Sequence, residues 1–253
     1  MAAARRRIDG APFAAMLGGM RAFFLLCLGL AAAPVSAAER RYPVTDFDRI
    51  EVDGPYVVRL TSGRPSAAVA TGPQAGIDRV TVEVNGQTLR IRRNRNGWTG
   101  TPGAQQGQVE IAVTTRSLRG ARMIGPGRLE VDRLAGLRGV LTVEGSGELV
   151  VAGIATDTLN LRLVGSGRLE ARGRTGTLNA LFEGSGNVEA GQLVAQDAVV
   201  ATTSFGTVAL NAARTARITA NGRGSVTVAG RPACTVVGPS ADLVRCGAQQ
   251  PSR

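Results

Sequence analysis

Leu161-Arg-Leu-Val-Gly165-Ser-Gly167-Arg-Leu169 is a stretch whose pattern recurs along the second half of the chain. Its centre, a Gly-x-Gly motif, has four clear copies and two weaker ones: Gly125-Pro-Gly127, Gly145-Ser-Gly147, Gly165-Ser-Gly167, Gly184-Ser-Gly186, Ser204-Phe-Gly206 and Gly222-Arg-Gly224. The steps between them are 20, 20, 19, 20 and 18 residues. A near-constant period of this length predicts a solenoid, in which each coil buries its apolar edge by stacking on its neighbours.

The residues around the motif repeat in columns. An apolar residue stands two places after each copy: Leu129, Leu149, Leu169, Val188, Val208 and Val226. Two further columns precede the motif, two and four places back: Val143, Leu163, Phe182, Thr202 and Ala220, then Leu141, Leu161, Ala180, Val200 and Ile218. This period of two predicts strands with these residues facing inward. The fold class is therefore all-β, a single-stranded parallel β-helix-like stack with about twenty residues per coil over residues 125–230.

The outward column directly after the motif carries charge. Arg128, Glu148 and Arg168 would stack as plus, minus and plus on neighbouring strands, followed by Asn187, Thr207 and Ser225. Such a ladder helps to fix the register of the strands. Because it is solvent-exposed, each contact contributes only a few tenths of a kcal/mol, roughly.

The Gly-x-Gly motif has two interpretations, a phosphate-binding loop and a tight corner of the chain. A phosphate loop requires a strand, the loop and a helix in succession, and no copy has that context. Recurrence once per coil instead favours a corner where the chain takes a positive φ or passes close to its neighbour. The turns also lack the Asp that calcium-binding repeats require.

Residues 43–116 are expected to form ordinary strands before the solenoid. They contain four alternating runs, Phe47–Val52, Tyr56–Leu60, Val80–Val84 and Thr88–Arg92, and Asn85-Gly86 between the last two predicts a β-hairpin. A Gly- and Asn-rich stretch from Asn94 to Gln108 interrupts the pattern, which resumes at Val109–Val113. No segment has a convincing helical period or caps.

Residues 1–37 have the features of a cleavable signal peptide. Arg21 precedes an apolar run too short to span a bilayer stably, and Val35-Ser-Ala37 or Ser36-Ala-Ala38 supplies a cleavage site. Met20 makes a better initiator than Met1 because Arg21 follows it at once. The alternative, a membrane anchor, is disfavoured by the lack of a second apolar stretch. We expect an exported protein, periplasmic, secreted or at the cell surface, with no transmembrane segment in the mature chain.

Cleavage of this segment changes the net charge of the chain and leaves two of its cysteines. Removal of residues 1–37 takes away four of the 30 basic residues and one of the 19 acidic residues, so 26 face 18, a net charge of +8. In an exported protein this favours an anionic envelope glycan or lipid head group, with another protein as an alternative, over nucleic acid. The other interpretation is that the charge serves solubility alone and reflects the use of Arg in place of Lys. Cys234 and Cys246 remain after cleavage and are expected to form a disulfide. Residues 246–253 are expected to form a C-terminal tail.

Several of these segments together resemble a known family. They are Phe47-Asp-Arg-Ile-Glu-Val-Asp-Gly54, the Asn85-Gly86 hairpin, the serial Gly-Ser-Gly motifs and Val226-Thr-Val-Ala-Gly-Arg-Pro232. Over residues 43–245 the chain resembles the autotransporter-adhesin head domain called the GIN domain. The resemblance implies a single exported β-solenoid-like domain, with an adhesin role by analogy.

The composition argues against catalysis. The chain has no His, and all 30 of its basic residues are Arg, so the commonest general base and any Schiff-base lysine are missing. The leading hypothesis is a non-catalytic ligand-binding envelope module with no cofactor and no metal. The alternatives are a polysaccharide lyase or hydrolase on a β-helix and a ligand-free structural protein. Glu130, Glu170 and Glu189 share one outward column, but a flat strand surface lacks the cleft of a glycosidase, so a solvated face is favoured.

One segment gathers features of a ligand site. Arg90, Arg92, Arg93 and Arg95 lead into a Gly-rich loop that contains Trp98, the single Trp of the chain. An indole beside guanidinium groups can stack on a sugar ring or lie at a lipid interface while the arginines bind phosphate or carboxylate. The alternative is an insertion between two strands with no role in binding. We single out Arg92, Arg93, Arg95 and Trp98 as the candidate ligand-binding residues.

Overall fold

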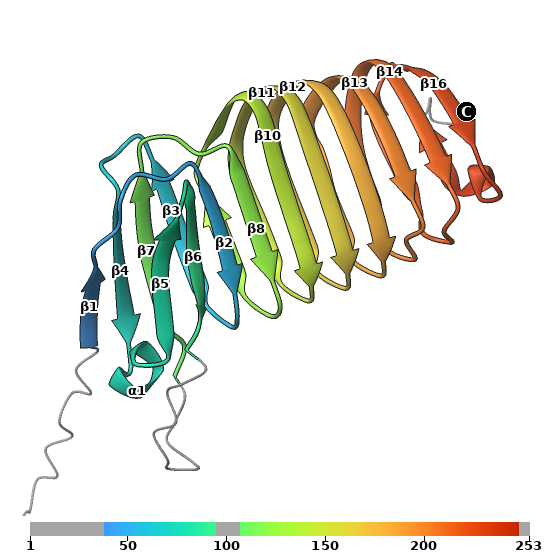
Figure 1. Ribbon diagram of the computed structural model, residues 1–253. Helices are drawn as coiled ribbons and strands as arrows, with labels where there is room; N and C mark the ends of the chain where they lie inside the picture. Colours follow the sequence, from blue (N-terminus) through green and yellow to red (C-terminus); the bar gives the residue numbers. More distant parts are fainter. Residues whose placement is uncertain (1–37, 95–106, 248–253) are drawn as a thin grey trace, which may run out of the picture. The chain divides into compact units, whose positions relative to one another are not determined.

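The computed structural model describes residues 38–94 and 107–247, all within one compact unit, residues 36–253. These residues form a nearly all-β solenoid with about 20 residues per coil, which confirms the predicted fold class (Figure 1). The strands of the repeat region are β8 (Gly120–Ile124), β9 (Arg128–Val131), β10 (Leu134–Gly145), β11 (Glu148–Gly165), β12 (Arg168–Gly184), β13 (Asn187–Thr202), β14 (Val208–Ala220), β15 (Val226–Gly230), β16 (Ala233–Val237) and β17 (Val244–Cys246). Each strand from β8 to β15 pairs in parallel with a strand one coil further on, and β16 and β17 end the stack.

Each coil contributes to two outer faces that meet at the Gly-x-Gly turn. We call the strand segments that lead into the turns the pre-turn face, and those that begin after the turns the post-turn face. Leu163 and Leu169 point inward from the two faces of one coil and are fully buried. All the inward residues predicted from the period are at most 7% exposed, so the column assignment is confirmed.

The turns are tight corners. Gly145 has a φ of +100°, a conformation that residues with a Cβ rarely adopt. A Cβ on Gly147 would lie 2.5 Å from the carbonyl oxygen of Gly125 in the neighbouring coil. The turns also hydrogen-bond to each other, since the Ser166 N–H donates to the Gly145 oxygen at 2.9 Å. Glycine is therefore required both for backbone conformation and for the close approach of neighbouring coils.

The N-terminal strands are β1 (Ala38–Tyr42), β2 (Arg49–Asp53), β3 (Val57–Ser62), β4 (Ala67–Gly72), β5 (Val80–Asn85), β6 (Thr88–Arg93) and β7 (Glu110–Thr115). The sequence suggested that they precede the solenoid, but several lie within its stack. Strand β2 pairs in parallel with both β6 and β8, and β3 pairs in parallel with both β7 and β9. The coil β2–β3 thus lies between the coil β6–β7 and the coil β8–β9, and the order of stacking differs from the order along the chain.

Antiparallel pairs complete this end of the stack. Strands β5 and β6 form the predicted hairpin, with Asn85 opposite Thr88, so the connecting residues are Gly86 and Gln87. Strand β4 pairs with β1 and β7. A short helix that the sequence did not predict, α1 (Gln74–Ile77), follows β4 and buries Ile77 completely.

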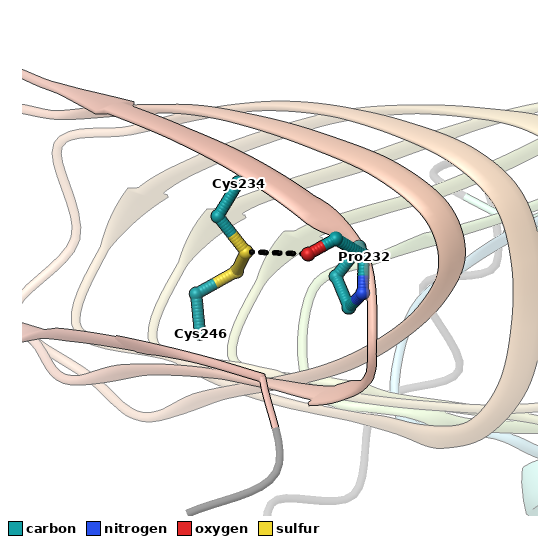
Figure 2. Close-up of a disulfide and its surroundings, with 3 residues drawn as sticks. All are labelled: Pro232, Cys234 and Cys246. Atoms are coloured by element: carbon teal, nitrogen blue, oxygen red, sulfur yellow. Dashed lines mark hydrogen bonds between the residues drawn. A yellow bond between two sulfur atoms is a disulfide. The ribbon is translucent and has the colours of Figure 1, made fainter.

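The last coil is closed by a covalent bond. Cys234 in β16, on the pre-turn face, and Cys246 in β17, on the post-turn face, form the predicted disulfide, with 6.4 Å between their Cα atoms (Figure 2). A 3-10 helix, η1 (Ala241–Leu243), connects the two strands. Across residues 38–94 and 107–247, no helix has the length and apolarity needed to cross a membrane.

Candidate ligand-binding site

Strand β6 carries Arg92 and Arg93, two of the arginines singled out from the sequence, and the neighbouring Arg90. Arg90 and Arg92 point outward from the pre-turn face, and Arg93 ends the strand. All three line a pocket of about 700 Å³, which we call the Arg93 pocket. The rest of its lining comes from four neighbouring parts of the fold: Glu51, Asp53, Gly54, Pro55, Thr81, Asn94 and Pro126. Arg95 and Trp98 lie outside the described residues, so their place relative to the pocket stays a prediction.

The arginines of the pocket differ in their partners. Arg90 lies 3.7 Å from Glu51, and Arg92 forms an ion pair of 2.6 Å with Glu83. Arg93 has no carboxylate partner within the described part of the chain. It lies beside the Tyr56 hydroxyl, whose pKa is raised by burial and is lowered in part by the Arg93 charge. The guanidinium group of Arg93 therefore donates no hydrogen bond to a carboxylate of any described residue.

Acceptors accompany these donors. Asp53 lines the same pocket and forms no ion pair with any described residue. Thr81 adds a hydroxyl from the neighbouring strand. A pocket with guanidinium donors, a free carboxylate and hydroxyl groups suits a ligand that is itself rich in hydroxyl and acidic groups.

A second pocket of about 490 Å³ continues along the pre-turn face and shares Arg90 and Glu51 with the Arg93 pocket. Its further charged lining, Arg49, Arg122, Glu144 and Arg162, was not singled out from the sequence. Gly120 lies between Arg49 and Val140 in the outward column and is buried, because the side chain of Arg49 packs over it. We call this second hollow the Gly120 pocket.

The post-turn face carries the charge ladder that the sequence predicted. Arg128, Glu148 and Arg168 lie in register on successive strands. Arg128 pairs with Glu148 at 2.5 Å, whereas Arg168 pairs with Glu189 at 2.8 Å instead of with Glu148. The ladder is present, but Arg168 forms its ion pair with Glu189, which lies two residues beyond the position directly opposite it.

The three glutamates considered as catalytic candidates also lie on the post-turn face. Glu130, Glu170 and Glu189 share the outward column, with Val150 between the first two. Each forms an ion pair with an arginine: Arg128 and Arg59 for Glu130, Arg172 for Glu170 and Arg168 for Glu189. The hydrogen bond from Arg128 lowers the pKa of Glu130, whereas a glycosidase acid requires a raised one. In the described ranges, no three His, Cys, Asp or Glu side chains gather in a way that could hold a metal.

Fold and surface together define a parallel β-solenoid domain with Gly-x-Gly turns and an arginine-lined surface pocket. Residues 46–232 match the family model described as "Putative auto-transporter adhesin, head GIN domain". The chain belongs to this family, as its sequence motifs suggested. A comparison with curated proteins gives no match.

Solved structures share the fold. A "putative adhesin" from Bacteroides fragilis NCTC 9343 has a TM-score of 0.71 at 20% identity, covering 85% of this chain and 98% of that one. A "putative adhesin" from Parabacteroides merdae ATCC 43184 has a TM-score of 0.63 at 14% identity, covering 86% and 98%. A "putative lipid binding protein" from Parabacteroides distasonis ATCC 8503 has a TM-score of 0.56 at 18% identity, covering 86% and 96%. At these identities the likeness establishes the architecture alone.

Proposed function

We propose that this protein is an exported, non-catalytic, adhesin-like module that binds the anionic group of an envelope glycan or lipid head group in the Arg93 pocket. The family description and the adhesin neighbours support a binding role at the cell surface. One neighbour carries lipid binding in its name, which supports testing lipids beside glycans. The basic, apolar and small-residue pattern of residues 1–37 supports export.

The observation that carries this proposal is the state of Arg93. It lines a pocket of about 700 Å³ together with Arg90 and Arg92, and it has no acidic partner among the described residues. A guanidinium group has five donors in a planar fork that fits carboxylate and phosphate. Because Arg93 need not break an ion pair to bind an anion, its full interaction is available to a ligand.

The ionisation state of the post-turn carboxylates supports binding over hydrolysis. A hydrolase needs one carboxyl group that stays protonated near neutral pH and a second that faces it across the substrate. Glu130 has its pKa shifted downward by Arg128, and it shares a flat column with Glu170 and Glu189. These residues have the features of a structural ion-pair network.

A titration tests the proposal. Trp98 fluorescence of the mature protein is followed as a uronic-acid oligosaccharide is added, and separately as vesicles of phosphatidylglycerol or of phosphatidylcholine are added. We expect one anionic probe to change the emission, with an effect that weakens as salt rises, because the interaction involves partly exposed charges. Response to phosphatidylglycerol alone identifies a lipid head group, and response to the oligosaccharide alone identifies a glycan.

Variants locate the binding. Arg93→Ala should weaken the affinity about tenfold, as expected for loss of a charge-assisted hydrogen-bonded contact. Arg217→Ala is the matched control, since Arg217 is exposed on the pre-turn face and has no ion pair within the described ranges. Calorimetry of a triple variant, Arg93→Ala with Arg95→Ala and Trp98→Ala, completes the series. Unchanged affinity in this triple variant would contradict the proposed site.

A further inference from the structure

One outward column of the pre-turn face carries an arginine on every second strand. In parallel register the column runs Arg90 on β6, Glu51 on β2, Arg122 on β8, Thr142 on β10 and Arg162 on β11. Neighbouring strands are about 4.8 Å apart, so the three arginines recur at roughly 9.6 Å along the solenoid axis. We call these five residues the arginine column.

The arginines of this column keep donors free for a ligand. The side chains of Arg90, Arg122 and Arg162 are 45%, 45% and 53% exposed. In three of their ion pairs the guanidinium nitrogen lies as far as 3.7–3.8 Å from the carboxylate oxygen: Arg90–Glu51, Arg122–Glu51 and Arg162–Glu183. Only the Arg122–Glu144 contact is close, at 2.8 Å. Since each guanidinium has five donors, each arginine can bind a carboxylate from solution without leaving its partner.

The surface beside the column is hollowed. The Arg93 pocket and the Gly120 pocket share Arg90 and Glu51, so the two form one continuous depression over β6, β2, β8, β10 and β11. Its lining includes six arginines against three acids: Arg49, Arg90, Arg92, Arg93, Arg122 and Arg162 against Glu51, Asp53 and Glu144. Val140, 45% exposed, adds an apolar surface beside the charges.

The column has defined ends. Beyond Arg162 the next positions are Leu181 and Ala201, which offer no charge. Beyond Arg90 lies Glu83, which is paired with Arg92. The arginines therefore span four strand spacings, about 19 Å.

The spacing of the arginines and the residues between them indicate which kind of ligand fits the column. Two sugar residues of an extended polysaccharide have about the same length as two strand spacings, roughly 9.6 Å. Glu51 and Thr142 lie between the arginines. Glu51 can accept hydrogen bonds from hydroxyl groups, Thr142 can accept or donate them, and the exposed Val140 can pack against the C–H face of a sugar ring.

From this geometry, and resting on the function proposed above, we propose that the ligand is a linear acidic polysaccharide with one carboxylate on every second sugar. The polymer lies along the solenoid axis, with successive carboxylates on Arg90, Arg122 and Arg162. The Arg93 pocket is then one end of an extended site.

The test uses fluorescently labelled hyaluronan fragments, which carry one carboxylate per disaccharide, and measures anisotropy with the mature protein. Affinity should rise about tenfold or more from the disaccharide to the hexasaccharide, since three carboxylates then meet three arginines. A neutral chitin hexasaccharide and a galacturonic acid hexasaccharide, acidic on every sugar, should both bind more weakly. Equal affinity for the disaccharide and the hexasaccharide would overturn the inference, as would equal affinity for the differently charged hexasaccharides.

Two pairs of variants locate the polymer. Thr142→Asp places a carboxylate between Arg122 and Arg162 and should weaken hexasaccharide binding about tenfold, whereas Thr219→Asp, in the same column beyond its charged part, should not. Arg122→Gln should also weaken hexasaccharide binding. Arg168→Gln is its control on the post-turn face, because Arg168 forms an ion pair of the same length, 2.8 Å, and should leave binding unchanged. Circular dichroism checks that all four variants are folded.

The outcomes separate this inference from the function on which it rests. If Arg93→Ala weakens the binding of acidic probes while Thr142→Asp and Arg122→Gln do not, the Arg93 pocket binds an anion and the extended site is wrong. If the hyaluronan hexasaccharide, the galacturonic acid hexasaccharide and the anionic vesicles all fail to bind, both proposals are wrong. If only the vesicles bind, the lipid arm of the proposed function stands and the polysaccharide is excluded.

Discussion

The pre-turn and post-turn faces are built from the same coils, share one core and both carry columns of Arg and Glu. On the post-turn face Arg128 pairs with Glu130 and Glu148, and Arg59 pairs with Glu110 and Glu130, so these five side chains form one connected network. On the pre-turn face, Arg49 and Arg93 have no acidic partner within the described residues, and the pockets of about 700 and 490 Å³ lie there.

The difference shows what an alternating charge column means in a solenoid. Opposite charges on neighbouring strands help to fix the register on both faces, and exposed pairs contribute little to stability, about 0.2–1 kcal/mol each. An ion-pair ladder by itself therefore does not indicate a ligand. The larger hollows, of about 700 and 490 Å³, and the unpaired Arg93 that lines the first of them distinguish the pre-turn face as the candidate for binding.

Substitutions in the core are expected to have the largest effect on stability, and they test whether the two faces share one core. Leu163→Asp on the pre-turn side and Leu169→Asp on the post-turn side each place a charge at a fully buried position. Each should lower the free energy of unfolding by about 4–5 kcal/mol, enough to unfold a marginally stable domain. Circular dichroism and urea titration measure the loss.

The neighbouring outward positions supply controls. Arg162→Asp and Arg168→Asp alter exposed side chains and should each cost about 1 kcal/mol or less. If only one of the two inward variants unfolds the protein, the faces do not form layers of one cooperative core. A cooperatively folded Leu169→Asp variant would show the inward column to be wrong.

The disulfide offers a second test, because it joins the two faces at the last coil. Replacing both Cys234 and Cys246 by Ser should lower the free energy of unfolding by about 2–3 kcal/mol, since the bond closes a short loop. Hydrogen exchange should become faster in β16 and β17 and stay unchanged in β10–β12. Uniformly faster exchange along the whole solenoid would instead mean that the last coil unfolds only together with the others.

The corner between the faces has a smaller expected effect. In Gly147→Ala the new Cβ would lie 2.5 Å from the Gly125 oxygen, so the backbone must shift, at a cost of about 1–3 kcal/mol. Gly191→Ala is the control, because no atom lies within 4 Å of the added Cβ. Equal unfolding midpoints in urea for the two variants would contradict the close approach of neighbouring turns.

The smallest effect concerns one ion pair at the margin of the pre-turn face. Hydrogen bonds from Arg214 and Thr215 lower the pKa of Asp197 to about 2. A carboxylate with a lowered pKa stabilises the fold above its unfolded pKa, and this contribution is lost as the pH falls through the folded pKa. Asp197→Asn should therefore make the loss of stability between about pH 4 and pH 2 less steep, as measured by thermal unfolding. Asp157→Asn is the control, because it removes a carboxylate that has no ion pair in the described ranges, and it should leave the pH dependence unchanged.

Much of the fold could be predicted because the repeat is regular. The period of about 20 residues placed Leu149, Leu169 and Val188 in one inward column, and these residues are buried in register. The place of β2 and β3 inside the stack could not be predicted, because it depends on which strand edge accepts a partner and leaves no periodic pattern. Helix α1 has four residues and no side-chain cap, so it had no sequence signal.

The candidate site was predicted only where its residues are adjacent in sequence. Arg92 and Arg93 were found because they follow each other on β6, whereas Glu51 and Arg122 reach the same depression from other coils. A partial signal existed, since Arg122, Thr142 and Arg162 recur at the motif period of 20 residues. The contribution of Glu51 had no such signal because β2 is out of chain order in the stack.

That stacking order has a consequence for the order in which the coils of the chain can assemble. The coil β2–β3 is synthesised early, yet both of its edges stay open until β6–β7 and β8–β9 have followed. Its contacts span many residues, and closing such long loops is slow. Every later coil needs only the next 20 residues or so to add to a finished edge. We therefore expect assembly of the first three coils, up to Val131, to be the slow step of folding, with elongation then proceeding coil by coil towards the C-terminal disulfide.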